Sequence, residues 1–197
     1  RLMPCYVGSM WARRGDGLAA LLYGPCTVET EVSGVKLKIE EKTSYPFSTR
    51  IEFVLSVEQP VRFPLSIREP GWTHGDVHVE APECDISREG AFHVVTRTWR
   101  NGDRVAVWFE APVHLQTLSN GEGVVRRGPL VFALPLPSRM HALPRVHHVP
   151  GFYDYDVVLE SEFPSNQVFL DGDAGDGGFT AVLDEDTDPQ EIGRAHV

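Results

Sequence analysis

Hydrophobic and polar residues alternate with a period of two along much of the chain, beginning near residue 27. Successive side chains of a strand point to opposite faces, so this pattern predicts strands with one buried and one solvated face. The alternating segments are residues 28–32, 35–39, 51–57, 61–67, 77–81, 91–99 and 105–109. Their number and spacing predict a mainly β fold, an antiparallel β-sandwich.

Turn residues support this interpretation. Asn101-Gly102 separates two alternating runs and predicts a type I′ hairpin, with Trp99 and Trp108 packing across neighbouring strands. Ser33-Gly34 and Asn120-Gly121 predict similar corners. Pro64 lies inside a strand pattern without an N–H to donate, which predicts an edge strand or a bulge.

Two segments lack the alternation. Residues 4–14 are apolar and aromatic and end at Gly15-Asp16-Gly17, so we interpret them as the end of a helix. Residues 135–150 contain four prolines and predict a surface loop. The following sequence YDYDVVLESEF, residues 153–163, predicts one more strand.

The distribution of charged and apolar residues limits the classes of partner that we expect. Of the net charge of −10, eight carboxylates fall in residues 171–191, which leaves about −2 for the rest. The sequence contains no cluster of Lys or Arg residues large enough to neutralise several phosphates, so we expect no nucleic-acid partner. No apolar run approaches the ~20 residues of a membrane span, so we expect no membrane partner. Cytoplasmic, periplasmic and secreted locations all stay open.

Candidate chemistry is sparse. Cys5, Cys26 and Cys84 are widely spaced and fit neither a disulfide framework nor paired zinc ligands, so we interpret them as small buried residues. His74 and His78 would lie ~13 Å apart along a strand, too far to share one zinc ion. We therefore predict no catalytic, cofactor-binding or metal-ligating residue in this chain.

Trp72 is the one candidate ligand contact. It follows a Pro-Gly corner in PLSIREPGW, where its ring could stack on a sugar. The same ring could instead cover the end of the sandwich, burying ~150–250 Å². The structural role is the favoured interpretation, and the carbohydrate contact stays open.

Several motifs in order carry a family resemblance. They are PCYVGSMWARRGDGLAALLYGP, TSYPF, PLSIREPGW, RTWRNGDRV, APVHL, RRGPLVFAL and FYDYDVVLESEF, and together they cover Pro4 to Phe163. This series resembles the β-L-arabinofuranosidase-type glycoside hydrolases, family 127 and its relatives. Glu69 departs from it, because an aliphatic residue is expected within the R-x-P-G-W motif; the departure questions a core position for Glu69 and leaves the turn intact.

The resemblance implies an (α/α) helical barrel that carries the chemistry, followed by β-sandwich domains. It also implies a catalytic zinc–thiolate cluster, built from Cys and Glu residues, with an adjacent Cys-Cys pair as its signature. This chain has no such pair, and Cys5 does not occupy the position of the nucleophile. We therefore expect zinc only in a missing catalytic domain, and we expect this chain alone to be inactive.

The expected organisation has five parts. They are residues 1–24 as a remnant of the catalytic barrel, 25–134 as the β-sandwich, 135–170 as a crossing loop and further strand, 171–191 as an acidic flexible tail, and 192–197, IGRAHV, as a sequencing-adapter artefact.

The expected function is a non-catalytic, bracing β-sandwich portion of a bacterial glycoside hydrolase acting on L-arabinofuranosides or related plant sugars. Its expected partner is the missing N-terminal catalytic barrel. A carbohydrate and a second copy of the chain are further candidates. The alternatives are a free-standing carbohydrate-binding module and a structural or interaction sandwich.

Overall fold

The computed structural model describes residues 2–73, 77–82, 84–121, 123–132, 137–146 and 153–160. The chain divides into two compact units, the first holding residues 1–112 and 127–130 and the second holding the remainder. Strands dominate the described residues, which confirms the predicted mainly β class. The predicted tail at 171–191 and the segment 192–197 lie outside the described residues.

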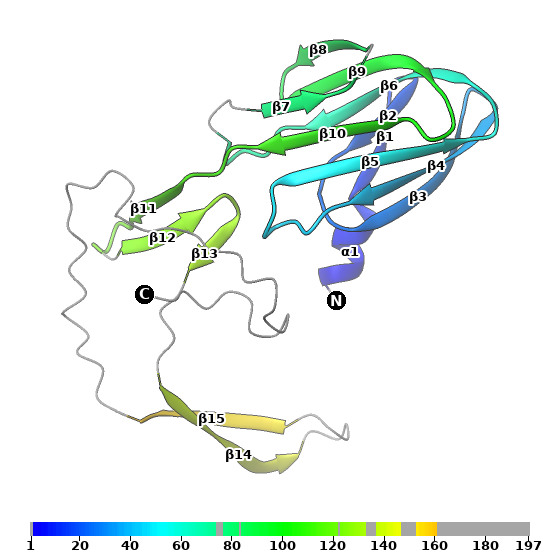
Figure 1. The fold of residues 1–197 in the computed structure, drawn as a ribbon. Helices are drawn as coiled ribbons and strands as arrows, with labels where there is room; N and C mark the ends of the chain where they lie inside the picture. Colours follow the sequence, from blue (N-terminus) through cyan, green and yellow to red (C-terminus); the bar gives the residue numbers. More distant parts are fainter. Residues whose placement is uncertain are drawn as a thin grey trace. The chain divides into compact units, whose positions relative to one another are not determined.

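The first unit is a β-sandwich of two five-stranded sheets (Figure 1). The first sheet has the order β1–β2–β6–β9–β8, with bounds Trp11–Arg14, Gly17–Ala20, Val61–Arg68, Phe92–Trp99 and Asp85–Glu89. The second has the order β3–β4–β5–β10–β7, with bounds Cys26–Val32, Val35–Lys42, Arg50–Val57, Arg104–Phe109 and Val77–Glu80. Neighbouring strands are antiparallel except β2 and β6, which are parallel.

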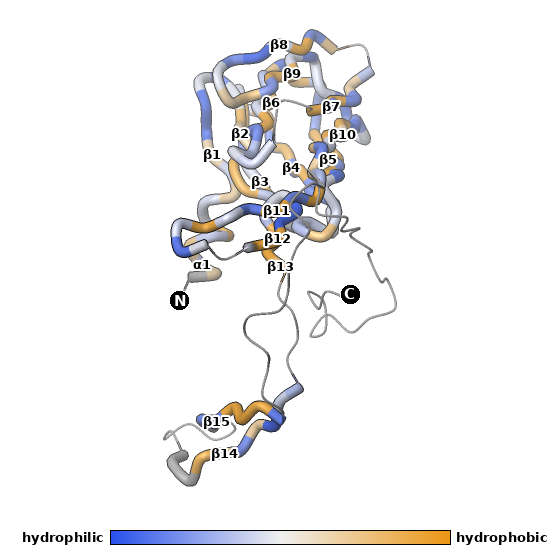
Figure 2. Tube along the Cα trace, turned by 90° about the vertical axis from the view of Figure 1, so that its left-hand side faces the viewer, coloured by the Kyte–Doolittle hydropathy of each residue, from blue (hydrophilic) through white to orange (hydrophobic). Residues whose placement is uncertain are grey.

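The core lies between the two sheets and follows the alternating pattern. In β4 the side chains of Val35, Leu37 and Ile39 are buried, whereas the two lysines between them are exposed. Figure 2 shows the same interleaving of hydrophobic and hydrophilic positions along the strands. Trp99 of β9 is fully buried, and its indole N–H donates to the Phe63 carbonyl at 2.9 Å. Its one polar atom is therefore satisfied inside the core.

One predicted corner is confirmed and another is wrong. Ser33 and Gly34 have φ of 50° and 77° and join the paired strands β3 and β4, as a type I′ turn requires. Gly102 has a φ of 87°, but β9 and β10 belong to different sheets, so Asn101-Gly102 makes no hairpin. The Gly102 N–H donates to the Leu55 carbonyl in β5 at 2.8 Å, which fixes this crossing between the sheets.

Pro64 does not lie on an edge, because β6 is the central strand of the first sheet. On one side Pro64 is paired with Thr96 of β9. On the other side the parallel pairing with β2 starts only at Leu18 and Leu65, so Pro64 precedes that ladder. Gly17 lies opposite, where an added Cβ would be 2.0 Å from the Pro64 carbonyl oxygen. Glycine therefore allows the two backbones to approach closely.

The N-terminal helix is shorter than predicted. The helix α1 covers Leu2–Gly8, and the chain then turns into β1 instead of continuing to Arg14. The strands β1 and β2 form a hairpin that pairs Arg14 with Gly17. Residues 11–20, expected to belong to a barrel remnant, thus join the first sandwich sheet. In the described part of the chain, no helix has the length and apolar character needed to cross a membrane.

Beyond the sandwich, the chain forms two small sheets. The strands β11 (Val113–Thr117), β12 (Gly123–Arg127) and β13 (Leu130–Phe132) make one, and β14 (Ser138–Val146) and β15 (Tyr153–Leu159) make the other. The predicted strand at 153–163 is confirmed in β15. The predicted loop over 135–150 is wrong for β14, which pairs with β15 and shifts register between Ala142 and Val146, around Pro144.

The contact between Gly17 and Pro64 predicts the effect of one methyl group. Gly17→Ala should lower the free energy of unfolding by about 3 kcal/mol, because its Cβ would collide with the β6 backbone. Urea denaturation followed by tryptophan fluorescence measures this loss. Gly71→Ala is the matched control, since nothing lies within 4 Å of a Cβ there. Equal, small effects of both substitutions would contradict the close approach.

Candidate functional site

Trp72 lies in a turn that follows β6. Both the N–H and the hydroxyl of Thr73 donate to the Pro70 carbonyl, at 3.1 and 2.8 Å, so the turn is intact. The Trp72 ring is half-buried and packs edge-to-face on Phe109 of β10, with 5.7 Å between ring centroids. This contact attaches the turn of the first sheet to the core of the second.

Other groups of the same unit also contact Trp72. Gly128 lies against its ring, where an added Cβ would be 3.4 Å from two ring carbons. Burial raises the pKa of Tyr45, and the neighbouring Trp72 side chain opposes that rise. The ring is therefore held by packing on both sides. Its role as a carbohydrate contact stays a prediction.

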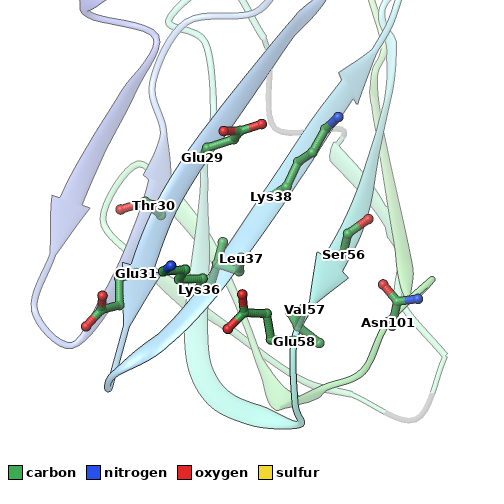
Figure 3. A pocket seen from close by; sticks show the side chains of 10 residues that line it. All are labelled: Glu29, Thr30, Glu31, Lys36, Leu37, Lys38, Ser56, Val57, Glu58 and Asn101. Atoms are coloured by element: carbon green, nitrogen blue, oxygen red, sulfur yellow. The ribbon is translucent and has the colours of Figure 1, made fainter.

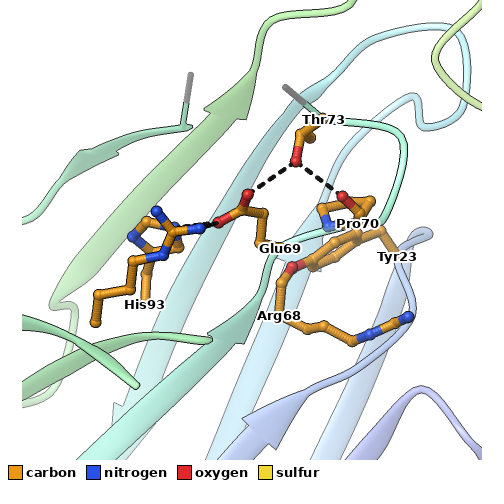
Figure 4. Close-up of polar contacts among 7 residues, drawn as sticks. Tyr23, Arg68, Glu69, Pro70, Thr73 and His93 are labelled. Atoms are coloured by element: carbon orange, nitrogen blue, oxygen red, sulfur yellow. Dashed lines mark hydrogen bonds and ion pairs between the residues drawn. The ribbon is translucent and has the colours of Figure 1, made fainter. Parts of the chain in front are cut away.

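Glu69 is the first residue of the same corner and lies in a polar network (Figure 4). One carboxylate oxygen accepts from the Thr73 hydroxyl at 3.1 Å, and the other is 3.1 Å from Nε2 of His93 and 2.8 Å from the Arg88 guanidinium. Partial burial alone would raise the pKa of Glu69, but the bonds from His93 and Thr73 and the charge of Arg88 lower it. An ionised, fully engaged carboxylate thus replaces the expected aliphatic residue.

A groove of about 630 Å³ lies along β3, β4 and β5 (Figure 3). It is lined by Glu29, Thr30, Glu31, Lys36, Leu37, Lys38, Ser56, Val57, Glu58 and Asn101. None of these described lining residues is aromatic, so the groove offers a sugar ring no stacking surface. Charges of both signs cover its wall, which is typical of a solvated sheet face.

Trp108 occupies the outer face of the second sheet. Its cross-strand neighbours are Arg50 in β5 and His78 in β7. His78 stacks on the indole with 5.1 Å between centroids and 11° between planes, and the Arg50 guanidinium lies 5.1 Å from the ring centroid. The predicted cross-strand packing is confirmed for Trp108. The ring is engaged by both neighbours.

The most unusual group is Glu41, at the end of β4. Its side chain is only 1% exposed. One carboxyl oxygen accepts from the Gly24 N–H at 2.9 Å, and the Cys26 thiol lies 3.7 Å from the other. The buried Trp11 indole N–H also faces this pair, although it makes no hydrogen bond of standard geometry. We call Tyr6, Trp11, Tyr23, Gly24, Cys26 and Glu41 the Glu41 cluster.

Burial controls the protonation of this cluster. It raises the pKa of Glu41 to about 7, although the bond from Gly24, the Cys26 thiol and the nearby Trp11 indole oppose the rise. Burial likewise raises the pKa of Tyr23 well above its usual value, and the Glu41 charge adds to that rise. An acid with a pKa near neutrality is suited to proton transfer, but this one is enclosed by the protein.

Sequence reasoning missed Glu41, although a signal was present. Val35, Leu37 and Ile39 all face the core, and Glu41 is the next residue of that odd-numbered series. A carboxyl group at an inward position of a strand predicts a buried, perturbed acid.

The cysteines differ from the prediction that all three are buried. Cys5 is exposed on α1, and Cys26 and Cys84 are half-buried. The prediction was wrong for Cys5 because this residue lies on the exposed side of α1, whereas the adjacent Tyr6 is half-buried. No disulfide joins these three residues.

The family comparison now adds to this geometry. The family model described as "Beta-L-arabinofuranosidase, GH127 middle domain" matches residues 17–111. These residues cover β2 to β10, which is most of the sandwich. Residues 17–111 are a GH127 middle domain. The resemblance is thereby confirmed for this domain, whereas its predicted C-terminal position in a longer protein stays a prediction. No curated protein matches the chain.

Solved structures share the fold of the GH127 middle domain and its flanking strands. A GH127 beta-L-arabinofuranosidase from Geobacillus stearothermophilus T6 has a TM-score of 0.56 at 22% identity, covering 77% of this chain and 31% of its own. A structure described as a glycoside hydrolase has a TM-score of 0.54 at 22% sequence identity, and the match covers 81% of this chain and 31% of that structure's chain. A GH127 beta-arabinofuranosidase has a TM-score of 0.55 at 19% sequence identity, and the match covers 74% of this chain and 29% of that structure's chain. The chain thus spans about a third of the length of each of these three structures.

The buried acid of the GH127 middle domain predicts how stability depends on pH. The folded protein holds the Glu41 proton up to a pKa of about 7, whereas the unfolded chain releases it near 4.5. The contribution of this group to the free energy of unfolding is therefore highest at low pH, and it falls by about 3 kcal/mol in total as the pH rises between these two values. Urea unfolding at about pH 5 and about pH 8 measures the loss.

Glu41→Gln should remove most of this slope. The amide keeps an oxygen that can accept from Gly24, but it does not ionise. The variant should therefore be more stable than the natural protein at about pH 8, with a smaller difference at about pH 5. Glu58→Gln, which changes an exposed side chain on the groove, is the control and should follow the natural protein. A Glu41→Gln variant with the natural slope would refute the assignment.

Trp72 gives a separate prediction for the corner. Trp72→Ala should lower the free energy of unfolding by about 2–3 kcal/mol, because the contacts with Phe109 and Gly128 are lost. Trp72→Phe should recover part of the loss. Calorimetric titration with an arabino-oligosaccharide separates packing from binding. Binding by the natural chain that disappears in Trp72→Phe, with stability retained, would assign Trp72 to the sugar.

Proposed function

We propose that the GH127 middle domain is a non-catalytic part of a glycoside hydrolase acting on L-arabinofuranosides or related plant sugars. In that enzyme it braces a helical catalytic part. The family match to residues 17–111 supports the enzyme class. The three structural matches support the fold of the domain.

The state of the two perturbed carboxyl groups is the observation that favours a bracing role. Glycoside hydrolysis needs two carboxyl groups that flank a bound sugar. Glu41 is sealed in the interior, and Glu69 is engaged by His93, Arg88 and Thr73. Glu41 cannot meet a substrate without opening its surroundings, and the Glu69 carboxylate is taken up by three partners within the corner. Neither group is therefore presented as one of a catalytic pair.

The zinc centre that the resemblance implies would belong to the catalytic part. Zinc needs about four ligands. Cys26 and Glu41 supply only two, and among the described residues no three His, Cys, Asp or Glu side chains come together to hold a metal ion. These residues do not fit a zinc–thiolate cluster. The partner in our proposal is therefore a catalytic barrel in the same bacterial polypeptide, which carries the metal and the nucleophile.

The isolated chain should show no hydrolysis of an aryl β-L-arabinofuranoside above the buffer blank, with or without added zinc, because neither Glu41 nor Glu69 is placed to act on the sugar. Release of the aryl group, measured by absorbance, tests this. Zinc-dependent hydrolysis that is lost in Cys5→Ser would show that the chain is itself catalytic and would overturn the proposal. Cys84→Ser is the matched cysteine control.

The bracing role has its own test in a longer enzyme that contains this domain. Deleting the domain should lower the temperature of thermal inactivation, since the catalytic part loses a packed neighbour. Unchanged inactivation temperature and unchanged hydrolysis after deletion would contradict bracing.

A further inference from the structure

One peptide group connects α1 with the buried carboxyl of Glu41. The hydroxyl of Tyr6, on α1, donates to the carbonyl of Tyr23 at 2.8 Å. The N–H of Gly24 donates to Glu41 at 2.9 Å. This carbonyl and this N–H belong to the same peptide bond. A hydrogen bond on one side of a peptide polarises the other side, so the two contacts are coupled.

The groups that face Glu41 are neutral at neutral pH. They are the Tyr6 phenol from α1, the Trp11 indole from β1, the Tyr23 phenol and the Cys26 thiol from β3. Arg68 acts on the neighbouring Tyr23, and its guanidinium donates to the Leu21 carbonyl, but no cation is among the groups that shift the pKa of Glu41. An ionised Glu41 would thus lie in the interior without a paired cation, which is unfavourable.

We propose that the protonation of Glu41 controls how firmly α1 is tied to the sandwich. With the proton on, the Glu41 cluster is closed and Tyr6 holds α1 against the Tyr23–Gly24 peptide. With the proton off, the buried anion gains water only if its cover opens. The Tyr6 contact then breaks, and α1 separates from the sheet end.

The cover opens at α1 because α1 is its weakest part. A helix of seven residues is far shorter than the ~12–15 residues that isolated helices need, so α1 depends on its contacts. Met3 and Val7 on α1 are 67% and 57% exposed and contribute little packing. Trp11 of β1, in contrast, packs edge-to-face on Phe53 in the core, with 5.6 Å between centroids. The strand side of the cover is therefore the firmer one.

Amide hydrogen exchange on the whole chain tests the proposal. At about pH 5.5 the natural chain and Glu41→Gln should protect residues 6–10 and 23–26 equally, after correction for intrinsic rates. At about pH 8, one unit above the pKa, these amides should be about tenfold less protected in the natural chain. Amides of β6, which open only when the sandwich unfolds, should stay far better protected than residues 6–10 in both proteins. Glu58→Gln should behave as the natural chain.

Tyr6→Phe removes the tie directly and provides the second variant. Its residues 6–10 should have low protection at both pH values, without the pH dependence of the natural chain. Equal protection in the natural chain and Glu41→Gln at about pH 8 would overturn the proposal. So would equal opening free energies at residues 6–10 and in β6 at about pH 8, because that result means that α1 opens only together with the whole sandwich. The switch is a property of this chain and holds whether or not the domain braces a catalytic part.

Discussion

Packing between two sheets is the interaction on which the rest of this structure depends. The inward side chains of β4, β5, β6, β9 and β10 form one continuous cluster, and each fully buried aliphatic or aromatic side chain contributes roughly 1.5–3 kcal/mol. Trp99 of β9 is fully buried in this layer and donates its N–H to the Phe63 carbonyl on the neighbouring strand β6 of the same sheet. The corners, the short helix and the polar networks are all built around that apolar layer.

Polar groups are placed where the apolar layer ends. Glu69 lies in the corner after β6 and is an ionised group that accepts from three donors. Glu41 lies near the end of β4 and is a buried acid with fewer hydrogen-bond donors. The difference between them is the presence of a cation, because Arg88 accompanies Glu69 whereas no cation faces Glu41 among the described residues. The same residue type thus gives a permanent anchor at one end and a proton-sensitive one at the other.

The sequence predicted local structure better than the pairing of strands and the contacts between residues distant in the sequence. Alternation located the strands around Val35, Phe53 and Phe63, and Ser33-Gly34 marked a true hairpin, because both signals act over a few residues. Asn101-Gly102 was misassigned because sheet membership depends on distant strands, and Pro64 was misassigned because its tolerance depends on Gly17, far away in the sequence. Glu41 required only the parity of β4 to be followed one position further.

Whether the two sheets form a single cooperative core can be measured directly. Native-state hydrogen exchange at increasing, sub-denaturing urea reports the opening free energy of amides in β6 and in β10. The account predicts that both sets converge on the same free energy and the same urea dependence, since neither sheet can keep its inward face dry alone. Two different values, with one sheet surviving after the other has opened, would contradict it.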